Sequence, residues 1–285
     1  FAQVTFTPTS GVTYHIAVDG YNPAFAAESG IVKLTIHLSS GTTTSTLRFN
    51  PNSLQRTTGQ FQAQLTGPPN TTIRIERSSD LRTWGSYHAG SLSAMGTYTF
   101  TNSGATGAAN FYRARTSEVQ PAIFIFSCNA VGYADYTVTA SVDQMIANPF
   151  NAVDNRISGV IAGPEEGTQF FKWDDEEDAW LPTNTYHSLF GGWSDPNMPL
   201  APGEGGVIRS GTGFNGTFLG EILQGYQVNS VPSGYSIRAS KYPRADVITS
   251  LGFPIANGDN IVKMSNGSLT TYTFHNGIWT PSQPV

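Results

Sequence analysis

The densest group of side chains able to do chemistry is the acidic run from Asp174 to Asp178, in which all five residues are Asp or Glu. Calcium takes several oxygen ligands, so such a run could hold a Ca²⁺ ion. It lacks the spacing of an EF-hand loop, and it lies between the aromatic residues Trp173 and Trp180, where a hairpin tip is expected. Five adjacent carboxylates cannot all face one ion from a tight turn. We therefore predict a solvated hairpin tip and no metal site, with a Ca²⁺ site as the alternative.

Signatures of catalysis are missing from the rest of the chain. The histidines show no His-Glu-x-x-His spacing, and no Gly-x-Ser-x-Gly elbow occurs. The glycine-rich residues 203–206 are not followed by Lys-Ser or Lys-Thr, so they do not form a phosphate loop. The two carboxylates of a glycosidase need not be close in sequence, but nothing indicates a particular pair. We predict a protein that is not an enzyme, with no catalytic residues and no cofactor; the histidines are His15, His37, His88, His187 and His275.

The single cysteine, Cys128, follows the apolar residues Phe124, Ile125 and Phe126. One cysteine excludes an internal disulfide. A cysteine in such surroundings, with no basic partner nearby, is typically a buried small hydrophobic residue. We therefore expect Cys128 to lie in the core.

The composition indicates an all-β protein. Charged residues make up 12% of the chain and aromatic residues 12%, with 30 Gly and 17 Pro. Many short strands with frequent turns have this profile. The net charge of −5 comes without a basic stripe, which argues against nucleic acid as a partner, and no apolar run reaches 18 residues, which argues against membrane insertion. We predict antiparallel, sandwich-like modules in tandem with very little helix, at most a turn or two near residues 245–251.

The first section, residues 1–47, reads as short strands and a linker. Residues 2–7 alternate, with Val4 and Phe6 on one face. The Val-Thr-Phe at residues 4–6, the stretch at 13–21 and Gly-Ile-Val-Lys-Leu at 30–34 resemble the last strands of bacterial pre-peptidase C-terminal β-sandwich domains. The resemblance implies a partial sandwich here.

The second section, residues 48–117, carries the alternating strands 61–65 and 72–76. Residues 76–84, which end at Trp84, together with the Phe-Tyr-Arg-Ala at 111–114, resemble a fibronectin type III-like module of large secreted bacterial proteins. The resemblance implies a β-sandwich, and we expect Trp84 in its core because a buried indole removes a large apolar area from water.

The third section, residues 118–285, contains an internal duplication. Residues 167–173 and Phe190-Gly-Gly-Trp193 recur in the same order as residues 258–263 and the stretch from Phe274 to Trp279. We divide the section into a first copy, 118–224, and a second copy, 225–285. The tandem unit resembles a β-module found at the C-terminal end of secreted and surface proteins of environmental bacteria.

The two copies differ at their ends. The first closes with Leu-Ala-Pro-Gly-Glu-Gly-Gly-Val-Ile at residues 200–208, whereas the second reaches Val285 where that strand is expected to begin. A sheet without its last strand exposes unpaired backbone groups that can pair with another chain. The chain begins at Phe1 rather than Met, so we expect it to be processed.

These features together predict a secreted, non-enzymatic structural protein, a subunit of an extracellular filament or cell-surface assembly. Copies of the chain would join head to tail by strand exchange, since a contact that does not close gives a polymer. The predicted subunit interface comprises Val4, Phe6, Trp279 and Val285.

The alternative is a carbohydrate-binding or adhesive accessory region of a larger secreted protein, with surface glycans as partners. Aromatic side chains concentrated in the duplicated section could stack on sugars, or they could fill two equivalent cores. The residues concerned are Trp173, Trp180, Tyr186, Trp193 and Trp279.

Overall fold

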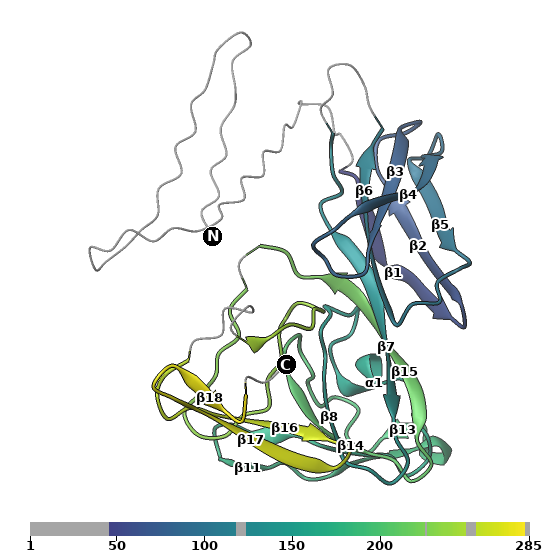
Figure 1. Cartoon of the computed structure of the whole chain (residues 1–285). Helices are drawn as coiled ribbons and strands as arrows, with labels where there is room; N and C mark the ends of the chain where they lie inside the picture. Colours follow the sequence, from purple (N-terminus) through teal and green to yellow (C-terminus); the bar gives the residue numbers. More distant parts are fainter. Residues whose placement is uncertain (1–45, 118–123, 226, 249–254, 283–285) are drawn as a thin grey trace. The chain divides into compact units, whose positions relative to one another are not determined.

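The computed structural model describes residues 46–117, 124–225, 227–248 and 255–282 (Figure 1). All of them lie in one compact unit, Thr44–Val285. These residues are almost entirely strand and turn, and the paired strands are antiparallel, so the predicted all-β class is confirmed. The helices among them are α1 (Ile157–Val160) and the 3₁₀ turn η1 (Ser188–Phe190). The turn expected near residues 245–251 falls partly outside the described residues.

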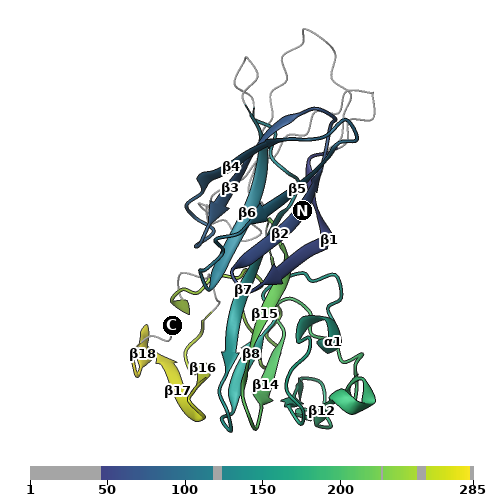
Figure 2. The same cartoon turned by 90° about the vertical axis from the view of Figure 1, so that its right-hand side faces the viewer.

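Two sheets enclose the first core (Figure 2). One has the order β1-β2-β5 and the other β15-β7-β6-β3-β4. In β2, Phe61, Ala63 and Leu65 are buried while their neighbours are partly exposed, which is the period of two expected for a strand with one inner face. The Phe61 ring stacks on Tyr112 with centroids 4.6 Å apart. The strands are β1 (Arg48–Thr57), β2 (Gln60–Thr66), β3 (Thr72–Ser78), β4 (Gly85–Ser91), β5 (Thr97–Asn102), β6 (Ala109–Thr116), β7 (Ala130–Val138) and β15 (Phe214–Ile222).

Strand β7 joins two sections that the sequence analysis separated at residue 117. It pairs with β6 on one side and with β15 along nine residues on the other. Val131 and Tyr133 on one face of β7 belong to the first core, and Ala130 and Val138 on the opposite face belong to the second. The expected boundary therefore runs through one continuous sheet, and the two sections share strands.

The second core lies between the sheet β13-β12-β9-β14-β8 and the face of β15-β7-β6 that points away from the first core. Phe170, Leu200 and Ile208 are fully buried there, and Ile157 and Ile161 of the α1 region pack into the same cluster. A two-stranded hairpin, β10 with β11, extends beside it. The strands are β8 (Gln144–Ala147), β9 (Gln169–Phe171), β10 (Trp173–Asp174), β11 (Ala179–Trp180), β12 (Asn184–His187), β13 (Gly192–Trp193) and β14 (Gly205–Arg209).

A third sheet consists of β16 (Asn260–Ser265), β17 (Ser268–His275) and β18 (Ile278–Thr280). Its turns are the two-residue stretches Asn266-Gly267 and Asn276-Gly277, and all four residues have positive φ. Asn-Gly with positive φ at both positions forms the type I′ turn, whose twist suits a hairpin. Most side chains of this sheet are exposed or half-buried.

Trp84 is not the core residue that we expected. It is partly buried and packs against the second core instead of filling the first, and the guanidinium of Arg113 lies 4.5 Å from its ring centroid. The preceding loop is fixed by Asp80, whose Oδ1 accepts the backbone N–H of Arg82 and Thr83 at 2.9 and 2.8 Å. This turn places Trp84 before β4, and the first core fills with Phe and Tyr side chains instead.

Cys128 is exposed, so the expectation of a buried cysteine is wrong. Its neighbours Ser127 and Asn129 are both buried. Successive side chains of an extended segment point to opposite faces, so burial of these two polar residues turns the thiol outward. Asn129 is held by bonds to the backbone of Phe49, whose N–H donates to its Oδ1 at 2.9 Å and whose O accepts from its Nδ2 at 2.9 Å.

Candidate functional site

Three strands of each copy share one arrangement. The order β13-β12-β9 in the first copy corresponds to β18-β17-β16 in the second. The N–H of Gly167 donates to the carbonyl of Tyr186 at 3.0 Å, and that of Gly258 donates to the carbonyl of Phe274 at 2.9 Å. Both glycines have positive φ, a conformation that glycine adopts without steric cost. The paired strand positions of the two units therefore correspond, although the turns between the strands differ in length.

The equivalence ends at one edge of the sheet. In the first copy β14 pairs with β9, with Val207 opposite Phe171, and β14 pairs in turn with β8. The counterpart of β9 is β16, and no strand among the described residues pairs with its outer edge. Strand β8 approaches β16 but does not pair with it. We call this unpaired side of β16 the open edge.

The hairpin turn determines which backbone groups face the open edge. In a two-residue hairpin the flanking residues, here Ser265 and Ser268, form a hydrogen-bonded pair, and every second pair along the strand does the same. The hydrogen bond from the Phe274 N–H to the Asp259 carbonyl, 2.9 Å, agrees with this alternation, since Asp259 lies six residues, an even number, before Ser265. Intervening residues point their N–H and C=O groups away from β17. On β16 these are Asn260, Val262 and Met264.

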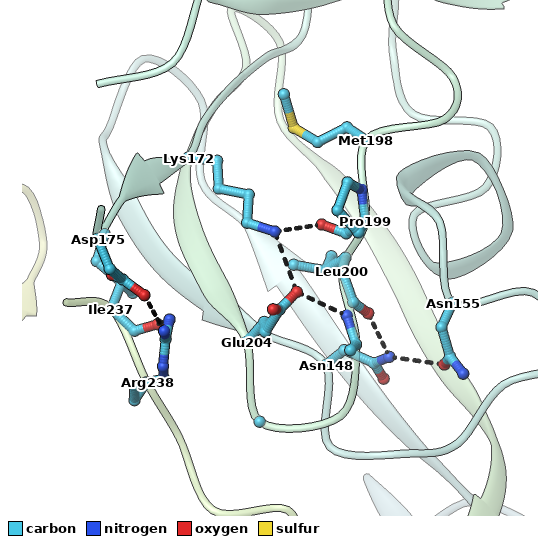
Figure 3. A network of polar contacts seen from close by, with 12 residues as sticks. Asn148, Asn155, Lys172, Asp175, Met198, Pro199, Leu200, Glu204, Ile237 and Arg238 are labelled. Carbon is cyan, nitrogen blue, oxygen red and sulfur yellow. Dashed lines mark hydrogen bonds and ion pairs between the residues drawn. The ribbon is translucent and has the colours of Figure 1, made fainter. Parts of the chain in front are cut away.

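The segment that leads into β14 is fixed by a largely buried ion pair (Figure 3). Lys172 follows β9, and its side chain is only 10% exposed. Its Nζ donates to the carbonyl of Pro199 at 2.6 Å and to Glu204 Oε2 at 3.0 Å. The same carboxylate oxygen accepts the N–H of Ala201 at 3.0 Å. With its charge paired and its Nζ bonded to two acceptors, Lys172 positions this segment.

Asn148 holds the same segment from the other side (Figure 3). Its residue is fully buried. Its Nδ2 donates to the carbonyl of Leu200 at 2.8 Å and to Asn155 Oδ1 at 3.2 Å, while its Oδ1 accepts the N–H of Phe150 at 3.0 Å. Buried polar groups that are satisfied in this way specify one backbone path.

Gly203, in the turn before β14, ties the first copy to the start of the second. Its carbonyl accepts the N–H of Ala239 at 2.9 Å and Asn229 Nδ2 at 3.1 Å. Its φ is +86°, and a Cβ there would lie 2.5 Å from Asn229 Nδ2. Only glycine fits this contact without a shift of the neighbouring chain.

The acidic run lies at the turn between β10 and β11, where the sequence placed it. Asp174 Oδ1 accepts the N–H groups of Glu176 and Glu177 at 2.9 and 3.2 Å. Asp175 forms an ion pair with Arg238 of the second copy, and both side chains are 18% exposed (Figure 3). Asp175 is thus part of the joint between the copies rather than a solvated residue. In the described part of the chain no group of three His, Cys, Asp or Glu side chains is close enough to hold a metal ion.

The equivalent tryptophans Trp193 and Trp279 are buried, at 5% and 7% exposure. Each lies opposite an aromatic residue of the next strand, Tyr186 and Phe274 respectively. Trp193 Nε1 donates to the Ile161 carbonyl at 3.2 Å, whereas Trp279 Nε1 is buried with no partner among the described residues. These side chains fill equivalent positions in the two copies.

The remaining aromatics form a partly exposed group that we call the aromatic cluster, made of Trp173, Trp180 and Tyr235. Trp173 is half-buried, Trp180 is 51% exposed and Tyr235 is 71% exposed. The ring centroid of Trp173 lies 5.1 Å from that of Trp180 and 6.1 Å from that of Tyr235, edge to face in both cases. Sequence reasoning missed Tyr235, because its approach to Trp173 depends on the contact between the copies.

Three histidines lie in the described residues, on separate strands. His88 Nε2 is 2.5 Å from the hydroxyl of Tyr98, and His187 Nδ1 is 3.1 Å from Glu166 Oε1. His275 ends β17. His15 and His37 fall outside the described residues.

Of the four predicted interface residues, only Trp279 is described. It is buried in its own module, so little of its surface is free for a neighbour. Val4, Phe6 and Val285 lie outside the described residues. The four-residue interface stays a prediction, and the residues that the sequence analysis did not single out are those of the open edge.

No family model, curated protein or solved structure matches this chain. The module types suggested by resemblance therefore stay predictions. Among residues that the structure describes, no helix has the length and hydrophobicity of a membrane span.

Proposed function

We propose that this chain is a non-enzymatic structural subunit of an extracellular filament or cell-surface assembly, and that the open edge of β16 accepts a strand from a neighbouring copy. The observation that carries the proposal is the difference between two equivalent strands. β9 is covered by β14, whereas the equivalent side of β16 is unpaired among the described residues. Unpaired strand edges bind extended peptides by adding them to the sheet.

The energy of strand addition is sufficient for a durable contact. A strand of five to seven residues adds roughly five backbone hydrogen bonds, each worth ~1 kcal/mol net. Each buried Val, Ile or Phe side chain adds ~1.5–3 kcal/mol. The donor predicted from sequence is residues 2–7, with Val4 and Phe6 as its apolar side chains. Those residues lie outside the described part of the chain.

The test removes one backbone N–H group that points outward from the open edge. Val262→Pro deletes an N–H that points away from β17, so the pairing of β16 with β17 is kept, and proline is tolerated at such edge positions. Val262→Ala is the matched control, because it shortens the side chain and keeps the N–H. Assemblies measured by light scattering and negative-stain microscopy should be lost in the proline variant and persist in the alanine variant.

Two further measurements test strand addition at β16. Circular dichroism must show a folded Val262→Pro chain, and Met264→Pro, at the next outward-facing position, should repeat its effect. Equal assembly by all three variants and the parent would refute strand addition at β16. Deletion of residues 1–7 tests the predicted donor separately.

A second candidate function is glycan binding by the aromatic cluster. Trp180 and Tyr235 expose much of their rings on either side of Trp173, and the Asp175–Arg238 ion pair lies close by in sequence. Exposed rings beside hydrogen-bonding groups suit the apolar faces and hydroxyls of pyranose sugars. Binding on a printed glycan panel should be lost in Trp180→Ala and kept in Trp180→Phe. A panel on which the parent chain binds no glycan would exclude this function.

A further inference from the structure

The proposed function leaves open which sequence pairs with the open edge, and β14 serves as a template for it. We propose that β16 takes an antiparallel strand with a glycine followed by two β-branched residues, and that residues 29–33 of a second copy supply it. This inference rests on the proposed strand addition and specifies its partner.

The register follows from the equivalence of the two copies. Val262 is equivalent to Phe171 and Ile261 to Phe170, because the Gly167 and Gly258 turns and the partner strands superpose in register. On β14, Val207 lies opposite Phe171 and the next residue, Ile208, opposite Phe170. The incoming strand therefore places its two β-branched residues opposite Val262 and Ile261.

The glycine is required by a close backbone approach. A Cβ at Gly206 would lie 2.5 Å from the carbonyl oxygen of Phe171 and 2.5 Å from the end of the Phe170 ring. Backbone atoms cannot move away as a flexible side chain can. At the open edge the carbonyl equivalent to that of Phe171 belongs to Val262, which points outward. The residue before the β-branched pair must therefore be glycine.

The β-branched residues are required by burial on both faces of the sheet. Ile208 is fully buried in the second core, next to Phe170, and Val207 on the opposite face is 7% exposed. The face of β16 that holds Ile261 also holds Tyr272, and Trp279 lies on the same face two strands away. A β-branched residue opposite Ile261 would extend this apolar face, and β-branched side chains suit a pleated, half-buried surface.

The pattern recurs in this chain. Residues 205–209 read Gly-Gly-Val-Ile-Arg, and residues 29–33 read Ser-Gly-Ile-Val-Lys, so all five positions match in type. When Val4 is aligned with Val207, the donor predicted from residues 2–7 puts Gln3 at the position of Gly206. A glutamine side chain conflicts with the close approach there. The template therefore selects residues 29–33 over residues 2–7.

The experiment uses the full chain carrying Gly30→Leu, so that its own residues 29–33 cannot occupy the open edge of another copy. A synthetic peptide of residues 27–35 is the probe. The peptide should bind, measured by calorimetry, and a peptide with leucine in place of Gly30 should bind at least about tenfold more weakly, the equivalent of 1.4 kcal/mol. Adding Val262→Pro to the chain should weaken the peptide about fivefold, since one hydrogen bond is lost. Adding Val262→Ala should leave binding within twofold.

Assembly of the full chain gives the second readout. Gly30→Leu should prevent assembly, while Gly11→Leu, which alters a similar Ser-Gly-Val-Thr stretch at residues 10–13, should not. Equal assembly by both variants would overturn residues 29–33 as donor while the proposed function stands. If the parent chain binds the peptide but does not assemble, the sequence proposed for the incoming strand is supported and the proposed function is refuted. Peptide binding that is weakened neither by leucine in place of Gly30 in the peptide nor by Val262→Pro in the chain would overturn the inference.

Discussion

The two copies of the duplicated section have the same strand register and very different surroundings. Strand β9 lies between β12 and β14, and its residue Phe170 is fully buried. Within the part of the chain that the structure describes, β16 pairs with β17 alone, and its equivalent residue Ile261 is half-buried. The difference shows that the local pairing of three strands does not require a filled core beneath them. Burial is supplied by the flanking strands and by the α1 region, which only the first copy has among the described residues.

The largest expected difference in stability is between alanine substitutions of the equivalent residues Trp193 and Trp279. Trp193→Ala should lower the free energy of unfolding by ~3–5 kcal/mol, because it empties a packed core and removes the bond to the Ile161 carbonyl. Trp279→Ala should cost less than about 2 kcal/mol, since its sheet is mostly exposed. Urea denaturation followed by circular dichroism measures both. Equal losses would mean that the second copy has a core of comparable strength.

A substitution at Gly206 tests the close approach of β14 to β9. Gly206→Ala should destabilise the fold by ~1–3 kcal/mol, because the new Cβ meets the Phe171 carbonyl and the Phe170 ring, each at 2.5 Å. Gly211→Ala is the control: no atom lies within 4 Å of its Cβ position, so its stability should stay within about 0.5 kcal/mol of the parent. The midpoint of thermal unfolding distinguishes them, and matching midpoints would show that β14 can shift at little cost.

The equivalent lysines Lys172 and Lys263 allow a smaller comparison. Lys172→Met should cost ~1–3 kcal/mol, because Glu204 then loses its partner in a partly buried site. Lys263 is exposed on β16, where the contacts of a charged side chain are screened by solvent, so Lys263→Met should change stability by less than about 1 kcal/mol. Denaturant titrations give both values. A larger effect at Lys263 would show that the second copy depends on that side chain more than its exposure indicates.

The smallest effect concerns the turn after β12. Hydrogen bonds from the Ser188 hydroxyl and backbone N–H, and then from His187, lower the pKa of Glu166 below its ordinary value of 4.5. A lowered pKa in the folded state means that the carboxylate stabilises the turn above pH 4.5 and that this contribution is lost as the pH falls through the folded pKa. Amide exchange at Ser188 should therefore accelerate in acid beyond its intrinsic pH dependence.

The second copy supplies the internal reference for that measurement, because its equivalent turn, Asn276-Gly277, contains no carboxylate. Exchange there should follow the intrinsic pH dependence alone. Glu166→Gln should remove the extra acceleration at Ser188. An unchanged acid response in that variant would assign the effect to another group.

Local patterns predicted much of this fold. Alternation placed Phe61, Ala63 and Leu65 on the inner face of β2, and the acidic run fell at a hairpin turn. The Asn266-Gly267 stretch has the turn chemistry that sets the register between β16 and β17. These features depend on residues close together in the chain.

Features that depend on distant pairing could not be predicted. The sharing of β7 between two cores requires β15, which begins 76 residues after β7 ends. Cys128 is exposed because Asn129 bonds to Phe49, 80 residues away in sequence. Tyr235 joins Trp173 only through the contact between copies. Composition and periodicity carry no information on such partners.

The ladder between β7 and β15 has a consequence for how the molecule melts. The two strands form a wall between the cores: Val131 and Tyr133 on one face belong to the first core, and Ala130 and Ile222 on the opposite face belong to the second. Unfolding of either core would expose apolar side chains of β7 and β15 to water. The two cores therefore cannot separate into independent folding units. Heating should therefore give one heat-absorption peak for both cores, with equal calorimetric and van't Hoff enthalpies.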